Sequence, residues 1–400
     1  MQFSHFIILA SLSFSFAGRH RGIKDTWSFD LGFSRISNWM SKIGNDVPLS
    51  ALTIPGTHSS MSYELTGSLT QTQNNNLACQ LLGGIRYFDI SCQYTNGNIM
   101  VYNGLVKTGF SLGDVLNTMF NFLDGHPQEA LILRIRKGGM LGDSKKLLDF
   151  IEQYFTPGSE MGDRAAQYIY FSDGDEATIP TLGEVRGKVV ILRDFKSSPP
   201  ARYGIPWNSN TVSSYSRRLA VGSVLRDLGW TSIRSHLSHS RSEDANKLRI
   251  THTTASVSIN PINTAAKNDP GRGMNQLLGR YIMSIITHGE GNCFGIIVMD
   301  FPGRSLVYQM VRLNEQYQAS EPSDLPPHHD DLPIPGELVD DINYDGINYD
   351  VEATSSDEDS DNDGDAALVD DIIYDERYYD DEVPPVDEDS DNEGGAALVG

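Results

Sequence analysis

The chain has 400 residues and a formal net charge of −22 at pH 7, with 53 Asp and Glu against 31 Lys and Arg. This balance argues against a protein that holds nucleic acid by its phosphates, because such proteins carry clustered basic charge. The 3 cysteines are too few for a disulfide framework, and they are too scattered along the chain for a structural zinc site.

The first recognisable pattern lies at the start of the chain. Residues 6–17 form an apolar run that ends in small residues, which is typical of a secretory signal with its cleavage site. The run is too short to anchor the protein stably across a bilayer. We therefore predict that residues 1–17 are a signal peptide and that the protein is secreted. A cytoplasmic protein is the alternative, because no Lys or Arg precedes the apolar run.

A second short apolar run, residues 51–54, is followed by Pro55, Gly56 and, two residues later, His58. Proline and glycine interrupt strands, so we predict a strand over residues 51–54 with His58 on the loop just after it. Catalytic groups collect at such strand ends, since loops aim side chains while strands hold them in place. A histidine after a turn is more often an ordinary surface or capping residue, so His58 alone does not establish a site.

Further apolar runs rich in β-branched residues predict strands, and helical patterns alternate with them. The predicted strands are residues 85–90, 99–102, 130–135, 189–192 and 295–299. The clearest helix is residues 111–123, where apolar residues recur at intervals of three and four, with Ser111 as its N-cap and Asp114 three residues later. A second amphipathic pattern covers residues 145–155. This alternation predicts an α/β fold with a parallel sheet closed into a (β/α) barrel.

The charge of the chain is concentrated at its end. Residues 321–400 contain 28 Asp and Glu and a single Arg377, a net charge of −27, whereas residues 1–320 carry about +5, from 25 acidic and 30 basic residues. This tail lacks sustained apolar periodicity and contains a 30-residue repeat, in which residues 357–369 return as 387–399. Because it cannot bury enough apolar surface to offset the entropy of ordering, we predict that it is disordered. The mildly basic remainder suits an anionic lipid surface or a phosphate-bearing ligand.

Four motifs in order give the chain a family resemblance. They are Pro-Gly-Thr-His at residues 55–58, Gly-Ile-Arg-Tyr-Phe-Asp-Ile at 84–90, His-Pro-Gln-Glu at 126–129, and a last apolar strand that ends at Asp300. Over residues 27–320 this set resembles the X domain of phosphatidylinositol-specific phospholipase C, of the bacterial and fungal single-domain kind. The resemblance implies an irregular TIM-type barrel that acts on phosphatidylinositol or a related anionic lipid as a peripheral protein at a membrane surface. It implies no nucleic-acid partner.

The resemblance also implies a mechanism. In the family, a histidine takes the proton from the inositol 2-hydroxyl, whose oxygen attacks phosphorus and expels diacylglycerol, and an aspartate orients that histidine. These roles fall on His58 and Asp300. Asn103 stands where the family has a second histidine that protonates the leaving oxygen. An amide has no proton to exchange near neutral pH, so Asn103 can bind a phosphoryl oxygen but cannot act as a general acid.

A positive centre completes the family's site, arginine in bacterial enzymes and calcium in animal ones. Ser91 stands at the position of that arginine. Calcium needs several oxygen ligands, and among the matching positions only Asp89 is acidic, so we predict no metal and no other cofactor. Arg136, at the family's basic position on its strand, and Arg134 lie on one face of that strand and could supply the charge. Arg86 could do so too, although a structural ion pair is an equal alternative.

The resemblance assigns further residues to the substrate pocket. The predicted substrate-binding residues are Arg86, Asp89, Arg136, Arg193 and Trp207. Trp207 or Tyr203 could stack on a sugar ring, although an ordinary packed aromatic residue is the alternative for both. Among the other histidines, His252 and His288 lie near predicted strand ends and could replace the missing acid, whereas His126 is predicted to be a turn residue.

Two functions remain open on these residues. The first is a phospholipase C-like phosphoric diester hydrolase of weak activity, with His58 as its base. The second is a catalytically inactive barrel that binds phosphoinositides or inositol phosphates. The resemblance alone does not choose between them, because function depends on the site and not on the barrel.

Overall fold

The computed structural model describes residues 26–31, 36–138, 144–171, 178–195, 203–216, 223–238, 246–255, 259–266, 273–289 and 293–318. All of them lie within Met1–Leu325, the first of the two units into which the chain divides. The predicted signal peptide, residues 1–17, and the predicted disordered tail, residues 321–400, lie outside the described residues.

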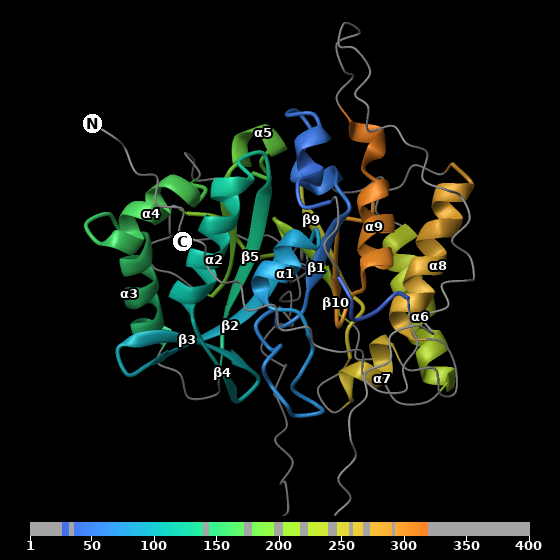
Figure 1. Cartoon of the computed structure of the whole chain (residues 1–400), viewed down its shortest axis with the longest axis horizontal. Helices are drawn as coiled ribbons and strands as arrows, with labels where there is room; N and C mark the ends of the chain where they lie inside the picture. Colours follow the sequence, from blue (N-terminus) through green and yellow to red (C-terminus); the bar gives the residue numbers. More distant parts are fainter. Residues whose placement is uncertain are drawn as a thin grey trace, which may run out of the picture. The chain divides into compact units, whose positions relative to one another are not determined.

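A curled parallel sheet forms the centre of the first unit (Figure 1). Its strands are β1 (Ile54–Thr57), β2 (Tyr87–Thr95), β5 (Ala130–Lys137), β6 (Lys188–Asp194), β7 (Ile205–Pro206), β8 (Val212–Tyr215), β9 (Leu248–His252) and β10 (Ile296–Met299). They run in the order β7-β6-β5-β2-β1-β10-β9-β8, and every neighbouring pair is parallel. Among the described strands no pairing joins β7 to β8. The predicted α/β barrel is therefore confirmed as an open, irregular one.

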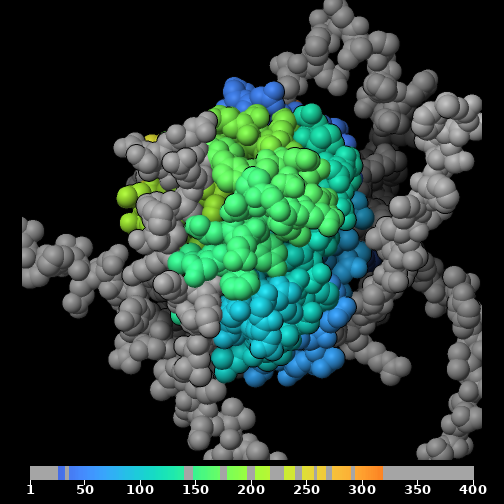
Figure 2. Space-filling model, turned by 90° about the vertical axis from the view of Figure 1, so that its left-hand side faces the viewer, coloured from blue at the N-terminus to red at the C-terminus, as the bar shows by residue number. Residues whose placement is uncertain are grey.

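Helices surround the curled sheet and lie to its left and right in Figure 1. They are α1 (Leu77–Leu82), α2 (Leu112–Gly125), α3 (Ser144–Phe155), α4 (Glu160–Tyr168), α5 (Leu182–Val185), α6 (Ser223–Ser238), α7 (Pro261–Ala265), α8 (Met274–Thr287) and α9 (Arg304–Arg312). Figure 2 shows the face on which α3 and α4, in green, form a continuous surface. None of the helices in the described part of the chain is long and apolar enough to cross a membrane.

The helix predicted over residues 111–123 is confirmed as α2. Ser111 is its N-cap, and its Oγ accepts a hydrogen bond of 3.2 Å from the backbone N–H of Asp114. The Asp114 carboxylate in turn accepts one of 2.7 Å from the backbone N–H of Ser111, which completes a capping box. The amphipathic pattern predicted over residues 145–155 is likewise a helix, α3.

The prediction for the first strand is wrong in its bounds. Residues 49–51 form a 3₁₀ turn, and β1 begins at Ile54 and runs through Pro55 and Gly56. Proline is tolerated because its carbonyl oxygen still accepts a hydrogen bond from the N–H of Arg86, at 3.0 Å. Glycine is needed because a Cβ at residue 56 would lie 2.7 Å from Cδ1 of Tyr87 on β2. His58 therefore follows directly after the strand, at its carboxyl end.

A hairpin interrupts the expected alternation of strands and helices. After β2 the chain turns at Asn96 and Gly97, both with positive φ, and returns as β3 (Asn98–Asn103), which is antiparallel to β2. Such a pair of residues favours a tight hairpin turn. β4 (Val106–Ser111) then pairs with β3, also antiparallel. The strand predicted over residues 99–102 is thus real, but it belongs to this hairpin and not to the parallel sheet.

Strand alternation divides the side chains between the barrel interior and the helix layer. Ile54, Ile250 and Ile296 are register partners in the interior. On the outer face of β10, Ile297 and Met299 belong to the apolar cluster formed with α8 and α9. The same alternation decides which polar residues near the strand ends reach the interior.

Candidate active site

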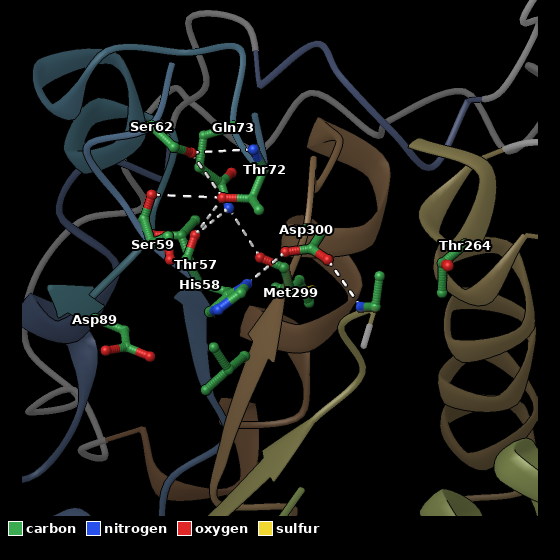
Figure 3. A network of polar contacts seen from close by, with 12 residues as sticks. Thr57, His58, Ser59, Ser62, Thr72, Gln73, Asp89, Thr264, Met299 and Asp300 are labelled. Atoms are coloured by element: carbon green, nitrogen blue, oxygen red, sulfur yellow. Dashed lines mark hydrogen bonds and ion pairs between the residues drawn. The ribbon is translucent and has the colours of Figure 1, made fainter. Parts of the chain in front are cut away.

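The carboxyl ends of β1, β2, β5, β9 and β10 meet at one edge of the barrel, here called the mouth. Parallel strands bring their carboxyl ends to the same edge, so the residues that follow them lie close together. The polar residues gathered there from the barrel interior are His58, Asp89, Arg134, Arg136, Asp194, His252 and Asp300. Figure 3 shows His58 with Asp300 on one side and Asp89 on the other.

His58 and Asp300 form the hydrogen-bonded pair that the resemblance predicts. The two atoms joined are His58 Nδ1 and Asp300 Oδ1, at 2.9 Å, and the side chains are 21% and 1% exposed (Figure 3). A carboxylate only accepts, so Nδ1 carries the hydrogen and Nε2 is left with its lone pair. The other carboxylate oxygen of Asp300 accepts from the backbone N–H of Ala255 at 3.0 Å. Both oxygens are thus held, and His58 is presented as a base.

The backbone around this pair is fixed by side chains from the loop after β1. Gln73 Nε2 donates to the carbonyl oxygens of His58, at 2.9 Å, and of Met299, at 3.0 Å. Thr72 Oγ1 donates to the carbonyl oxygen of His58 at 2.9 Å (Figure 3). The resemblance did not indicate Gln73 or Thr72, and their amide and hydroxyl groups are common in loops. Their role depends on how the loop folds back against the two strand ends, which no local sequence pattern predicts.

The residues after His58 and Asp300 both have a strained backbone. Ser59 has φ of 41° and Phe301 has φ of 46°, a region that residues other than glycine seldom adopt. Strain of this kind persists where surrounding structure enforces it, and it clusters at functional sites. Here the two strained positions flank the base and its orienting carboxylate.

Asp89 lies between two arginines of β5. Its carboxylate oxygens are 3.6 Å from Arg134 Nη1 and 3.3 Å from Arg136 Nε. Burial alone would raise the pKa of Asp89, but Arg136 and Arg134 lower it to about 2, so the side chain is ionised. Neither of its oxygens, nor Arg136 Nε, has a hydrogen-bond partner among the described residues. Buried polar atoms without a hydrogen-bond partner are uncommon in folded proteins, and here the two ion pairs offset the charge of the Asp89 carboxylate.

Arg134 is held more tightly than Arg136. Its Nε and Nη2 donate to Asp194 Oδ2 at 3.1 and 2.6 Å, and its guanidinium lies 3.7 Å from the ring centroid of Trp207. Burial would lower the pKa of Arg134, but Asp89 and its other neighbours raise it above the ordinary value. Trp207, predicted to bind substrate, therefore has one ring face covered by a cation.

His252 lies at the mouth as well. It ends β9 on the interior face, and its ring centroid is 6.5 Å from that of His58. Burial and Arg134 lower the pKa of His252 to about 3, so its imidazole is neutral near pH 7. The other histidine considered for this place, His288, is exposed at the end of α8, where the chain leads into the opposite end of β10. His288 is therefore excluded from the mouth.

Asn103 lies at the end of β3 and serves as a structural link. Its Oδ1 accepts from Ser59 Oγ at 3.0 Å, and its Nδ2 donates to the carbonyl oxygen of Thr70 at 2.6 Å. Ser91, in register with Arg136, is buried on β2. Asn103 thus ties the β3–β4 turn to the loop that carries His58.

Two predicted substrate-binding residues do not reach the mouth. Arg86 is fully buried, and its guanidinium pairs with Glu129 at 2.8 Å and donates to backbone carbonyls, including that of Leu81 at 2.8 Å. Arg193 alternates with Asp194 and so lies on the outer face of β6, 5.8 Å from the ring centroid of Tyr203. The structural ion pair is the correct interpretation of Arg86, and the assignment of Arg193 to the pocket is wrong.

His126 lies at the end of α2, away from the residues of the mouth. His126 is the C-cap of α2, with Nδ1 2.9 Å from the carbonyl oxygen of Phe122, and is the turn residue predicted. Among the described residues no group of three or more His, Cys, Asp and Glu side chains is arranged to hold a metal ion.

Residues 47–194 match the family model described as phosphatidylinositol-specific phospholipase C, X domain. Two curated relatives are both named 1-phosphatidylinositol phosphodiesterase. The protein of Listeria monocytogenes is 28% identical over 298 residues, which is 69% of this chain and 84% of the relative. The protein of Staphylococcus aureus is 30% identical over 163 residues, which is 39% of this chain and 50% of the relative.

Two solved structures share the fold. The phosphatidylinositol-specific phospholipase C of Listeria monocytogenes is 24% identical and superposes with a TM-score of 0.55, covering 70% of this chain and 99% of that one. The Staphylococcus aureus phospholipase, in its F249X mutant, is 18% identical with a TM-score of 0.56, covering 72% of this chain and 100% of that one. Residues 47–194 of this chain are thus the part that resembles the X domain of phosphatidylinositol-specific phospholipase C at the level of a family model.

Proposed function

We propose that this protein hydrolyses phosphoric diesters of the phosphatidylinositol type, with His58 as the general base. The observation that supports this most directly is the 2.9 Å hydrogen bond between His58 Nδ1 and the buried Asp300 carboxylate. This arrangement leaves Nε2 free to take a proton and stabilises the imidazolium that results. The names of the curated relatives point to the same substrate class.

The chemistry follows from the groups at the mouth. His58 Nε2 takes the proton of the inositol 2-hydroxyl, the oxygen attacks phosphorus, and the bond from phosphorus to the diacylglycerol oxygen breaks, which leaves a cyclic inositol phosphate. Arg136 is the cation best placed to meet the phosphoryl oxygens, since it pairs with one carboxylate where Arg134 pairs with two, and its side chain is 34% exposed against 12% for Arg134. We propose slow turnover, because Asn103 offers no proton and loss of a positioned acid costs about two to four powers of ten in rate.

The second candidate function is binding without turnover. It is favoured by the engagement of Arg134 with two carboxylates, Asp89 and Asp194, which leaves less positive charge for a transition state than an unpaired arginine would give. A barrel of this kind would hold an inositol phosphate and release it unchanged.

Cleavage of phosphatidylinositol by the full-length protein decides between the two. The lipid is presented in mixed micelles, and the water-soluble inositol phosphates are followed by phosphorus NMR. Turnover that His58→Ala abolishes and His288→Ala leaves unchanged supports the hydrolase. Binding of inositol 1-phosphate without any turnover supports the binding barrel. A protein that shows neither activity nor binding contradicts both candidate functions.

We also propose that the rim of the mouth meets the lipid surface. Leu69 and Leu105 are each 50% exposed and Val106 is 40% exposed. These three residues are here called the apolar rim. Leu69 lies on the loop after β1, and Leu105 and Val106 lie where β3 turns into β4, and the hydrogen bond from Asn103 to Thr70 joins the two segments. Exposed apolar side chains beside a lipid-cleaving site suit insertion at a membrane interface. Membrane binding is described for the Staphylococcus aureus phospholipase.

A further inference from the structure

His252 brings a second imidazole to the mouth, across β10 from His58. It is in register with Val298 and only 7% exposed, and the two histidine rings meet edge to face at 81°. Its ring nitrogens have no hydrogen-bond partner within the part of the chain that the structure describes. These nitrogens are also not among the fully buried side-chain atoms that lack a partner, so water or a ligand at the mouth can reach them.

The separation of the two rings suits opposite ends of one phosphodiester. In-line displacement puts the attacking and leaving oxygens on opposite sides of phosphorus, so the base and the group that meets the leaving oxygen must stand apart. The ring centroids of His58 and His252 are 6.5 Å apart, too far for a hydrogen bond between the rings. Asn103 is less available for this task, because Ser59 and Thr70 already bind its oxygen and nitrogen.

We propose that His252 faces the leaving glycerol oxygen and stabilises it with a hydrogen bond from a neutral imidazole N–H. This inference rests on the proposed hydrolase function and names the group that takes the place of a cationic acid. A neutral imidazole is an established electrophile in enzymes, where a lowered pKa keeps it uncharged and still able to donate.

The electrostatics of the mouth support the neutral form. The charged and titratable groups that face His252 are His58 after β1, Asp89 on β2, and Arg134 and Arg136 on β5. Burial disfavours the imidazolium, and the two arginines add to this effect, whereas Asp89 opposes it and does not prevail. His252 therefore has an N–H to donate but no cationic proton to lose at neutral or alkaline pH.

The proton balance is simple. His58 takes the proton of the attacking hydroxyl, the new oxygen–phosphorus bond forms, and the bond to the glycerol oxygen breaks. The glycerol oxygen, held by the His252 hydrogen bond, takes a proton from a water molecule at the mouth. The hydroxide that remains takes the proton from His58, which restores the base.

Two substrates test the proposal in the full-length protein. Phosphatidylinositol has an alkoxide leaving group that needs stabilisation, whereas inositol 1-(4-nitrophenyl phosphate) releases a nitrophenolate that is stable by itself. We expect His252→Ala to lower kcat on phosphatidylinositol by about a hundredfold, the usual cost of one lost oxyanion donor, and to leave kcat on the aryl ester roughly unchanged. His252→Gln, which keeps a donor, should restore much of the loss. His288→Ala is the matched control.

The pH profile gives a second readout. For the wild-type protein, kcat on phosphatidylinositol should not fall at alkaline pH, because a neutral donor has no cationic proton to lose there. A fall at alkaline pH that disappears in His252→Gln would show a cationic acid and overturn the proposal.

Each remaining outcome has a separate meaning. Equal losses on both substrates would overturn the proposal in favour of a role in binding or folding, and circular dichroism of the variants tells these two apart. A wild-type protein that cleaves neither substrate would overturn the proposed hydrolase function, and the role of His252 with it. Turnover of both substrates with no effect of His252→Ala would overturn the role of His252 alone.

Discussion

Gln73 Nε2 donates a hydrogen bond of 2.9 Å to the carbonyl oxygen of His58. The same nitrogen donates to Met299, one residue before Asp300, at 3.0 Å. One amide therefore spans the two strand ends that supply the base and its orienting carboxylate, and it sets the distance between them.

Replacing Gln73 by Leu should misplace His58 relative to Asp300. We expect kcat on phosphatidylinositol to fall by roughly ten- to a hundredfold with a smaller change in KM, because small displacements of catalytic groups have large effects on rate. The control is Gln71→Leu, a change of the same kind on the same loop, where the amide donates only to the carbonyl oxygen of Tyr63 at 3.3 Å. Equal losses in both variants would mean that the loop as a whole, and not the Gln73 link, matters.

Asp300→Asn tests the orienting carboxylate. An amide can donate to His58 Nδ1, which favours the tautomer with its hydrogen on Nε2 and removes the base. We expect kcat to fall by about three to four powers of ten while the protein stays folded, as judged by circular dichroism. If the variant retains most of the wild-type rate, His58 does not act as the base.

The buried pair of Arg86 and Glu129 should act on stability and not on the site. Both side chains are fully buried, so Glu129→Gln leaves the guanidinium charge without its counter-ion. We expect the free energy of unfolding to fall by about 3 kcal/mol in urea titrations. Glu315→Gln, which breaks the exposed pair with Arg312, should change it by less than about 1 kcal/mol. A near-zero effect of Glu129→Gln would contradict the assignment of Arg86 to the core.

The lowered pKa of His252 predicts how the stability of the protein depends on pH. Its pKa is lowered from 6.5 to about 3 on folding, so between these values the unfolded chain binds a proton that the folded protein does not. Stability is therefore lost as pH falls below about 6.5, by on the order of 3 kcal/mol at pH 4. His252→Gln should flatten the dependence over this window, whereas His288→Gln should leave it unchanged. Thermal unfolding of the variants from pH 7 to pH 4 measures the difference, and parallel curves for wild type and His252→Gln would contradict the burial of a neutral His252.

The apolar rim predicts a defect in membrane binding that is separate from catalysis. Leu105→Asp should weaken binding to phosphatidylinositol-containing vesicles by about tenfold or more, because burying a leucine side chain contributes roughly 2 kcal/mol. Met283→Asp is the control, since Met283 is 43% exposed on α8, away from the mouth. Cosedimentation with the vesicles measures binding, and hydrolysis of a soluble inositol ester should be the same in both variants. Equal binding of Leu105→Asp and wild type would contradict the rim.

The sequence was informative where local patterns decide the structure. The capping box of Ser111 and Asp114 predicted α2, and the apolar runs at residues 130–135 and 189–192 are the cores of β5 and β6. The bounds of β1 were wrong because Pro55 and Gly56 usually interrupt strands, whereas here the Pro55 carbonyl accepts from the N–H of Arg86 and Gly56 packs closely against Tyr87. That packing depends on a strand thirty residues away, which no local pattern reveals.

The candidate site was predictable where motifs carried it. His58 and Asp300 were paired correctly across the chain by resemblance. Arg86 and Arg193 were misplaced because residue type says nothing of which way a strand side chain points, and a shift of one residue exchanges the two faces. His252 was one of two candidates, with His288, because its neutral state arises from burial beside Arg134, a property of the assembled barrel.

The stack of Trp207 on Arg134 has an optical consequence. The fluorescence of an indole depends on nearby charge, and the Arg134 guanidinium lies 3.7 Å from the centroid of the Trp207 ring. A bound phosphate that draws Arg134 towards itself therefore changes the fluorescence of Trp207. Occupancy of the barrel should thus alter the intrinsic fluorescence of one of the chain's 4 tryptophans, and Trp207→Phe should remove the response. The protein carries its own label for ligand titration, whether or not it turns the ligand over.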